Sequence, residues 1–326
     1  MNNTRRKPTP HPDARDLQPG LVVATHGRHV MVESPDGQRR ICHPRGKKSH
    51  SVVGDQVAWL ASEDEGTIET VHPRRNLFYR QDEIRTKSFA SNLDQVLILL
   101  AAEPEFSERQ LARALISAEA EGIKPLIVLN KSDLGTLFDA AWSRLRPYRD
   151  MGYDVLPLCL KSAHDPTASS VRSDSAIDAL EGHLNGKVTL VLGPSGVGKS
   201  TLINHWVPQA LASTNEISRA LNSGKHTTTS TSWYWVDEPK TTALIDSPGF
   251  QEFGLHHIAP TRLPDLMPDL KAHLGQCKFY NCTHLHEPGC GILASIQNDA
   301  TENPISDNRY KIYTELFEEL SQIRPW

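Results

Sequence analysis

The stretch KVTLVLGPSGVGKST, residues 187–201, constrains the fold of this chain more than any other feature. Its first part, residues 188–192, is apolar and rich in β-branched side chains, which predicts a buried strand. The turn GPSGVG follows, and the next residues, KSTLINHWV, have the pattern of a helix. A strand, the pattern G-x-x-x-x-G-K-[ST] and a helix in this order are typical of a phosphate-binding loop. The chain is therefore expected to bind a nucleoside triphosphate.

The residue types in this loop fit the chemistry of phosphate binding. Glycines allow several backbone N–H groups to point into one cavity, and the helix contributes the positive end of its dipole. Lys199 is expected to reach the terminal phosphates, and the Ser200 hydroxyl to bind Mg²⁺. The loop residues expected at the nucleotide are Gly193, Pro194, Ser195, Gly196, Val197, Gly198, Lys199, Ser200 and Thr201.

A second motif, NKSD, follows at the end of the apolar run KPLIVLN, which is expected to be a strand. The Asp133 carboxylate can accept from both N–H donors on the edge of guanine, an arrangement that adenine does not present. Asn130 can contact the other base edge, and the stem of Lys131 can pack on the ring, with Ser132 completing the motif. Together with the phosphate loop, this short motif predicts a guanine site.

A third motif lies in TTALIDSPG, where Asp246 and Gly249 fit the pattern D-x-x-G. Asp246 is expected to hold Mg²⁺ through water, and the Gly249 N–H to contact the γ-phosphate. The segment SGKHTTTST lies between this motif and the phosphate loop, and one threonine of its run is expected to bind Mg²⁺. The sequence does not choose among them, and Thr228 is taken here as the candidate from the set Thr227, Thr228 and Thr229.

The order of the three motifs is unusual, because the base motif comes before the phosphate loop in this chain. A circular permutation explains this order, and it is tolerated when the original termini lie close together. Strand and helix patterns alternate over residues 93–255, which predicts an α/β domain with a mostly parallel sheet and helices on both faces. Residues 231–238 alternate as an antiparallel strand would.

The chain before this domain divides into three parts. Residues 1–17 are polar and proline-rich, which predicts a disordered tail, and residues 18–80 hold five or so short strands, which predicts a small β-barrel. Residues 81–92 are expected to form a linker. Basic residues fit an oligonucleotide-binding face on the barrel, although a barrel that serves only as a cover has the same pattern. They are Arg39, Arg40, Arg45, Lys47 and Lys48.

Composition limits the class of protein. The chain is 38% hydrophobic and 23% charged, as ordinary globular proteins are, and it has no apolar run long enough for a bilayer. A signal-peptide pattern is also absent from its first residues, so a cytoplasmic location is expected. The net charge of −4 argues against a uniformly basic nucleic-acid binder. Residues 1–50 nevertheless hold ten Lys or Arg against four Asp or Glu, which fits either local polyanion binding or a solvated tail.

Three of the five cysteines lie in CKFYNCTHLHEPGC, residues 277–290. In a cytoplasmic protein such a cluster indicates a metal site rather than disulfides. Cys277, Cys282, His284 and Cys290 can form a closed tetrahedral Zn²⁺ shell, with His286 as a second candidate for the imidazole. Metal binding would supply folding energy to a small domain over residues 256–326, which ends in an amphipathic helix at 310–323. The two remaining cysteines, Cys42 and Cys159, are expected in the core.

In combination, these motifs resemble the bacterial ribosome small-subunit-dependent GTPase family RsgA, also called YjeQ. The resemblance rests on GPSGVGKST, NKSD, GKHTTT, DSPGF, NLDQVLIL and the cysteine cluster. It implies an N-terminal OB-fold barrel, a circularly permuted GTPase domain and a C-terminal zinc domain with His284 as ligand. It also implies a late role in maturation of the 30S subunit. The family usually has a Ser-Ser pair near the guanine, where this chain has Cys159-Leu160, with Ser162-Ala163 as a rival position.

The residue after D-x-x-G bears on catalysis. Many GTPases carry a Gln there that orients the attacking water, whereas this chain has Phe250. Intrinsic hydrolysis is therefore expected to be slow. His226, beside the switch threonines, is the candidate catalytic residue, and a surface histidine next to Lys225 is the alternative interpretation.

The sequence as a whole predicts a monomeric GTPase that binds the 30S subunit and 16S rRNA, carries Mg²⁺ with GTP and one Zn²⁺, and has no membrane partner. A GTP-dependent RNA-binding scaffold with incidental hydrolysis is the alternative from another class. An ATP-using enzyme is a second alternative, against which Asp133 argues. Because D-x-x-G runs directly into the cysteine-containing region, nucleotide could also tilt that region.

Overall fold

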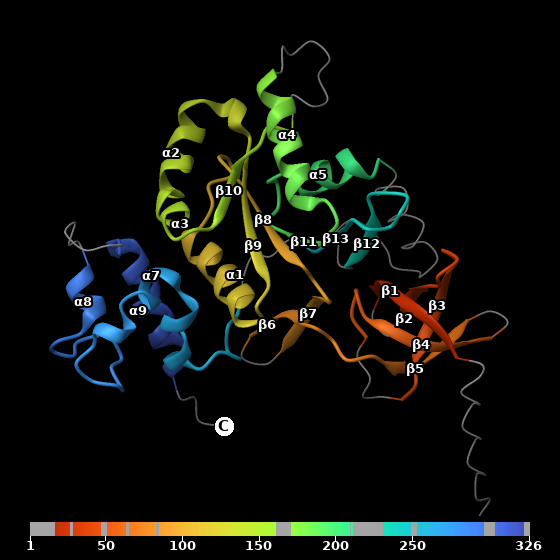
Figure 1. Ribbon diagram of the computed structural model, residues 1–326, viewed down its shortest axis with the longest axis horizontal. Helices are drawn as coiled ribbons and strands as arrows, with labels where there is room; N and C mark the ends of the chain where they lie inside the picture. The colour runs from red at the N-terminus through yellow and green to blue at the C-terminus, as the bar shows by residue number, and fades with distance from the viewer. Residues whose placement is uncertain are drawn as a thin grey trace, which may run out of the picture. The chain divides into compact units, whose positions relative to one another are not determined.

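The computed structural model describes residues 17–26, 29–46, 51–62, 65–82, 85–160, 171–208, 210, 231–248, 253–296 and 304–322. The chain divides into two compact units, Met1–Arg74 and Arg75–Trp326. Figure 1 shows the elements of both units.

The first unit contains a closed five-stranded barrel. Its strands are β1 (Gln18–His26), β2 (His29–Glu33), β3 (Arg39–Pro44), β4 (Gln56–Ala61) and β5 (Gly66–Val71). They pair in the order β1–β2–β3–β5–β4, and β4 pairs again with β1, which closes the barrel. This is the OB-type barrel that the sequence predicts. Its interior is filled by Val22, Val30, Val32, Cys42, Val57, Trp59 and Ile68.

Two of the barrel arginines are already paired with carboxylates. Arg39 Nε donates to Glu33 at 2.8 Å, and Arg45 forms an ion pair with Glu69. Their charges are therefore partly neutralised within the barrel, and they do not form the bare basic face that the composition suggests. The lysines expected on this face lie outside the described residues.

The second unit is built on a mostly parallel sheet. Its strands are β8 (Gln95–Ala101), β9 (Lys124–Asn130), β10 (Asp154–Pro157), β11 (Val188–Leu192), β12 (Ser232–Trp235) and β13 (Ala243–Asp246). They run in the order β10–β9–β8–β11–β13–β12, and only the β12–β13 pair is antiparallel. The parallel sheet is confirmed, and the antiparallel strand expected within 231–238 is found at Ser232–Trp235.

Helices cover both faces of this sheet. On one face α4 (Val171–Leu184) and α5 (Lys199–Trp206) pack against alternate strand residues, among them Leu97, Leu99 and Val191. The strand residues in between point to the other face, where α1 (Glu108–Ala120) contacts β8 and β9. After β9 the chain forms two consecutive helices, α2 (Thr136–Arg144) and α3 (Arg146–Asp150). The break falls just before Pro147, which lacks the N–H that a continuous helix would need.

A separate two-stranded sheet precedes β8. It consists of β6 (Leu77–Gln81) and β7 (Thr86–Ser91), and β7 occupies half of the stretch predicted to be a linker. That prediction is wrong, because Phe89 is buried with its ring 5.8 Å from Phe78 and 6.0 Å from Phe253. The sequence TKSFAS shows no clear apolar alternation, so these distant aromatic partners explain the strand better than its local pattern does.

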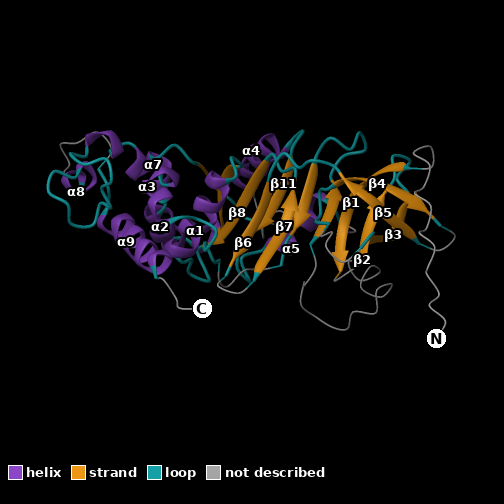
Figure 2. Ribbon diagram, turned by 90° about the horizontal axis from the view of Figure 1, so that it is seen from below, coloured by secondary structure: helices purple, strands orange, loops and turns teal. Residues whose placement is uncertain are grey.

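After β13 the chain forms short helices and loops, as Figure 2 shows. These helices are η3 (Pro260–Arg262), η4 (Pro264–Leu266), α7 (Pro268–Lys271), η5 (Leu274–Gln276), α8 (Gly291–Ser295) and α9 (Asp307–Ser321). The last of them, α9, confirms the predicted amphipathic helix, and its buried Ile312, Tyr313 and Leu316 confirm that its apolar face packs in a core. Across the described ranges, every helix is too short or too polar to cross a bilayer.

Candidate functional site

The phosphate loop connects β11 to α5 and needs glycine at two positions. A Cβ at Gly193 would lie 2.4 Å from the carbonyl oxygen of Leu99, and one at Gly198 would lie 2.6 Å from Asn130 Nδ2. Gly198 also has a φ of +106°, in the left-handed region that favours glycine. The close approach of β8 and Asn130 therefore dictates the glycines of this motif.

Lys199, the first residue of α5, and Asp246, the last residue of β13, lie at the same loop. Lys199 Nζ donates to the carbonyls of Gly193 at 2.8 Å and Pro194 at 2.9 Å. Burial lowers the pKa of Lys199, against the effect of the Asp246 charge, and burial raises the pKa of Asp246 to about 6, against the effect of Lys199. A cation and a carboxylate held in this way can bind a phosphate and a divalent metal ion side by side.

Ser247 is a site residue that sequence reasoning missed. Its hydroxyl is buried and donates to the carbonyl of Val191 at 2.7 Å, one strand away. Val191 and Asp246 are partners in the β11–β13 register, so this bond fixes Asp246 beside the phosphate loop. In the sequence, Ser247 is simply the serine inside DSPG. Its role becomes apparent only when the neighbouring strand β11 supplies the acceptor.

Asn130 joins the NKSD motif to the phosphate loop. Its Nδ2 donates to the carbonyl of Val197 at 2.8 Å, and its Oδ1 accepts from the N–H of Leu160 at 3.3 Å. The side chain is only 3% exposed. Asn130 therefore holds the phosphate loop and the Leu160 backbone, a role that the sequence did not predict, and its contact with a base edge stays a prediction.

The rest of the NKSD motif forms a turn that lies along the loop after β10. Lys131 has a φ of +66°, and η1 (Ser132–Leu134) follows it. The Ser132 N–H donates to the Leu158 carbonyl at 3.0 Å, and the Cys159 thiol donates to Asp133 Oδ1 at 3.5 Å. Cys159 is buried, as predicted. Its contact with the exposed Asp133 was not predicted. Two sequence signals pointed to this region: the place of Cys159 after a strand of the same sheet, and the family resemblance that sets Cys159-Leu160 near the guanine.

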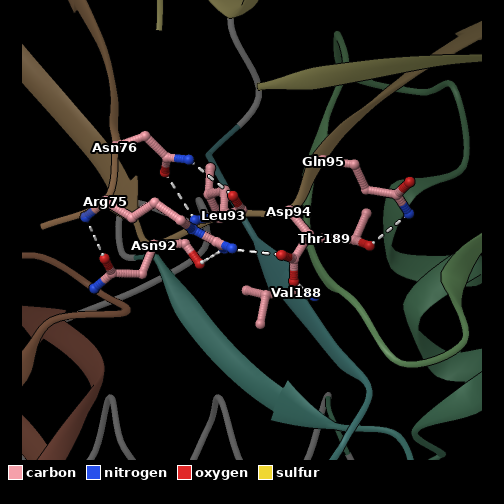
Figure 3. Close-up of polar contacts among 8 residues, drawn as sticks. All are labelled: Arg75, Asn76, Asn92, Leu93, Asp94, Gln95, Val188 and Thr189. Carbon is pink, nitrogen blue, oxygen red and sulfur yellow. Dashed lines mark hydrogen bonds and ion pairs between the residues drawn. The ribbon is translucent and has the colours of Figure 1, made fainter. Parts of the chain in front are cut away.

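Residues at the start of β8 and just before it hold the strand that carries the phosphate loop (Figure 3). Asp94 Oδ2 accepts from the N–H of Val188 at 2.8 Å, while its Oδ1 accepts from Arg75 Nη2 at 2.8 Å. Gln95 Nε2 donates to Thr189 Oγ1 at 2.8 Å. These bonds fix β11 against β8, so the NLDQ segment supports the position of the loop.

The carboxyl ends of β9, β11 and β13 bring the predicted nucleotide residues to one edge of the sheet. The structure thus places together NKSD, residues 193–201 and Asp246, with Ser200 and Thr201 exposed on the first turn of α5. Other predicted residues lie outside the described part of the chain. These are His226, Thr227, Thr228, Thr229, Gly249 and Phe250, together with Ser162 and Ala163.

The cysteine cluster has the geometry of a zinc shell. The ligand atoms of its four residues, Cys277, Cys282, His284 and Cys290, all lie within 4.8 Å of one another. His284 Nδ1 is 3.5 Å from Cys277 Sγ and 3.4 Å from Cys290 Sγ, and these two sulfurs are 4.0 Å apart. A tetrahedral Zn²⁺ with bonds of about 2.0–2.3 Å sets its ligands roughly 3.3–3.8 Å apart, so the donor set fits this metal. His286 is exposed and is not part of the cluster.

Hydrogen bonds from outside the cluster orient it. The N–H groups of Gly291 and Leu293 donate to the sulfurs of Cys277 and Cys290 at 3.4 and 3.5 Å. From α9, Tyr310 donates to the His284 carbonyl at 2.8 Å, and Tyr313 donates to the Thr283 carbonyl at 2.7 Å. Such partners fix ligand orientation and tune metal affinity.

Comparison with known proteins gives consistent matches. The family model described as RsgA GTPase matches residues 71–256. Small ribosomal subunit biogenesis GTPase RsgA of Variovorax paradoxus is 67% identical over 311 residues, 95% of each chain. The protein of that name from Paraburkholderia phymatum is 48% identical over 320 residues, 98% of this chain and 96% of the other.

Solved structures match as well. The crystal structure of YjeQ from Thermotoga maritima has a TM-score of 0.68 at 28% identity, over 94% of this chain and all of the other. That of YloQ, described as a circularly permuted GTPase, has a TM-score of 0.66 at 24% identity over 98% of this chain, and it bears on the fold alone. The motif order, the sheet and these matches agree, and the chain belongs to the RsgA GTPase family, with a circularly permuted GTPase fold.

Proposed function

We propose that this protein is a cytoplasmic, monomeric GTPase of small-subunit biogenesis that binds the 30S subunit and leaves it when GTP is hydrolysed. The observation that carries the proposal is the meeting of three motifs at one sheet edge, with Asn130 bonded to Val197 of the phosphate loop. A base-recognition motif and a phosphate loop in direct contact fit a guanine nucleotide and its phosphates. The name that the relatives carry supplies the ribosomal subunit.

The residue roles follow from the chemistry of the site. Asp133 recognises the N–H donors of guanine, and the stem of Lys131 packs on the ring. Residues 193–201 hold the phosphates, and Lys199 neutralises charge at the β- and γ-phosphates. The oxygen donors of Ser200 and Asp246 fit Mg²⁺, with Thr228 as the proposed third donor. Gly249 contacts the γ-phosphate through its N–H.

Hydrolysis is proposed to depend on positioning and charge stabilisation, without a covalent intermediate. Mg²⁺, when bound, neutralises charge on the phosphate oxygens. His226 orients the attacking water, since Phe250 cannot. The test is His226→Ala, which should abolish subunit-stimulated turnover and leave GTP affinity within about twofold of the parent. Unchanged stimulated turnover would show that His226 is a surface residue.

The cysteine cluster is proposed to hold one Zn²⁺ as a structural metal, since its four protein donors leave no open position for water. Metal analysis of the purified protein should find one zinc per chain. Cys282→Ser should lose it, whereas Cys42→Ala, in the barrel core, should retain it. The region that this metal organises is proposed to span residues 256–326, next to a GTPase domain that ends near residue 255.

Contact with 16S rRNA is proposed for the barrel and for the loop between the first two cluster cysteines. In that loop Tyr280 is fully exposed, Phe279 is 42% exposed, and Lys278 Nζ lies 5.5 Å from the Phe279 ring centroid. Exposed aromatic rings beside a lysine fit stacking on unpaired RNA bases. The loop between these cysteines, residues 278–281, contains this lysine and no acidic residue, so its own charge is positive.

Two measurements test the proposal. GTP should displace a bound guanine nucleotide and ATP should not, because the Asp133 carboxylate would be left unpaired against adenine. Purified 30S particles should stimulate GTP turnover and 50S particles should not. Binding to 30S without any stimulation would favour the alternative, a GTP-dependent scaffold with incidental hydrolysis.

A further inference from the structure

A buried arginine connects the segment after D-x-x-G to the C-terminal helix. Arg113 lies in α1 and is 8% exposed. Its Nη1 donates to the Phe253 carbonyl at 3.0 Å, and its Nη2 forms an ion pair with Glu319 of α9. Phe253 follows Gly249 by four residues, so one guanidinium joins the exit of the nucleotide motif to the last helix of the chain.

The segment that Arg113 holds is well anchored. The Gln81 N–H donates to the Gly254 carbonyl at 3.1 Å, and the His256 N–H donates to the Gln81 carbonyl at 3.0 Å. A Cβ at Gly254 would lie 2.4 Å from that Gln81 carbonyl oxygen, so only glycine fits this close contact. Phe253 packs on Phe78 with ring centroids 5.6 Å apart. Residues 253–256 are therefore docked on β6, and this segment cannot shift by itself without breaking several contacts.

The partner of Arg113 on α9 leads to the metal cluster. Glu319 also accepts from Arg109 Nη2 at 2.9 Å, so two arginines of α1 hold the end of α9, which lies beside α1 in Figures 1 and 2. Earlier in the same helix, Tyr310 and Tyr313 donate to carbonyls next to the cluster. A rigid helix thus joins the Arg113 contact to the loop that carries His284.

We propose that Arg113 is a positioning residue through which the nucleotide state of the D-x-x-G motif is passed to α9 and to the zinc-binding region. This inference rests on the proposed function, because it takes nucleotide to displace D-x-x-G. The physical reason is the cost of a buried charge that loses an acceptor, which makes the Phe253 carbonyl and Glu319 move together rather than apart. The coupling runs through the side chain of Arg113 and does not depend on the intervening polypeptide alone.

Hydrogen exchange of α9 in the full-length, zinc-loaded chain tests this proposal without a ribosome. Exchange is measured in saturating GDP and in a non-hydrolysable GTP analogue. The parent chain should show α9 exchange rates that differ between the nucleotides by about threefold or more. Arg113→Met should bring the two rates to within about 1.5-fold of each other, with nucleotide affinity and zinc content retained.

Arg109→Met is the matched control. It removes the other arginine from Glu319 and leaves the Phe253 contact in place, so it should keep most of the nucleotide-dependent difference. Arg113→Lys keeps the charge and can reach one acceptor at a time, so it should recover part of the difference. If Arg113→Met loses zinc or nucleotide, the comparison of Arg113→Lys with Arg109→Met tests the proposal instead. An equal nucleotide-dependent difference in α9 exchange in these two variants would overturn the proposal.

Three further results would contradict the role of Arg113. One is a parent chain whose α9 exchange is the same with both nucleotides. Another is an Arg113→Met variant that keeps the parent difference. The third is an Arg113→Met variant whose α9 exchanges faster by the same factor in both nucleotides, which is what a purely structural contact gives. The ribosomal proposal is tested separately. If 30S particles do not stimulate turnover but α9 exchange still depends on the nucleotide through Arg113, the ribosomal proposal fails and the role of Arg113 stands.

Discussion

Asn130 Nδ2 donates a hydrogen bond to the carbonyl of Val197 at 2.8 Å, from the end of β9 to the middle of the phosphate loop. The two residues lie far apart in sequence, and the bond is buried. It places the base-recognition motif at a fixed position relative to the loop. Formation of the nucleotide site is therefore cooperative, since disturbing either motif disturbs the other.

Replacing Asn130 should loosen the phosphate loop itself. In Asn130→Ala, the buried Val197 carbonyl and the Leu160 N–H lose their partners, and GTP affinity should fall about tenfold. The amides of Gly193 and of residues 195–198 should exchange faster in the absence of added nucleotide. The control is Asp133→Ala, which should weaken GTP binding and leave loop exchange as in the parent. Parent-like loop exchange in Asn130→Ala would mean that this residue acts only at the base.

The thiol of Cys159 should contribute to guanine binding by orienting Asp133. Cys159→Val keeps the size of the side chain but removes the donor at 3.5 Å from Asp133 Oδ1, so GDP affinity should fall about fivefold, roughly 1 kcal/mol. Cys159→Ser retains a donor and should stay within about twofold of the parent. Titration with a fluorescent guanine nucleotide measures both, with Cys42→Ala as the control. Equal affinities of the valine and serine variants would remove this role.

Metal-dependent nucleotide binding should weaken in mild acid because of Asp246. Burial raises its pKa to about 6, against the effect of Lys199, so the carboxylate gains a proton as the pH falls through that value. Mg²⁺ needs the ionised form, so the enhancement of GDP affinity by Mg²⁺ should shrink about tenfold per pH unit below about 6. Above that pH it should be constant. Titrations with and without Mg²⁺ between about pH 5 and pH 8 measure it.

A matched variant isolates this carboxylate from other titrating groups. Asp246→Asn should bind nucleotide with little enhancement by Mg²⁺ at any pH. A parent enhancement that stays constant down to about pH 5 would contradict the assignment of Asp246 as the metal-binding carboxylate.

The parts of the site that the sequence predicted are those whose chemistry lies in short contiguous motifs. The phosphate loop, NKSD, the Asp246 position and the cysteine cluster each combine a residue pattern with an expected strand or helix. The meeting of the first three at one edge of the sheet followed from the rule that parallel strands present their carboxyl ends together. The barrel was predictable from its alternating strands and turns.

What the sequence did not predict depends on partners far along the chain. The strand β7 forms because Phe89 meets Phe253, and nothing local marks it. The bond from the Asn130 amide to the Val197 carbonyl was not predicted, because its acceptor is a backbone group that no side-chain pattern reveals. In the sequence, Arg113 is one of several charged residues of a predicted helix, and only the fold shows that Glu319 is its partner.

Tyr280 should contribute to the affinity for the 30S subunit. It is fully exposed on a loop whose ends are fixed by cluster cysteines, so stacking on an RNA base costs little conformational entropy. Tyr280→Ala should raise the 30S concentration for half-maximal stimulation about tenfold, and Tyr280→Phe should stay near the parent. Leu137→Ala, at another exposed apolar residue, is the control and should have no effect. Parent-like behaviour of Tyr280→Ala would assign the RNA contact elsewhere.

The most direct test of the whole account is steady-state GTP turnover by the zinc-loaded protein, alone, with purified 30S particles and with 50S particles. Slow turnover alone, stimulation of about tenfold or more by 30S, and none by 50S are the predicted results. Lys199→Ala should abolish the stimulated activity. Equal turnover in all three mixtures, with GTP bound normally, would contradict a GTPase whose site is completed on the small ribosomal subunit.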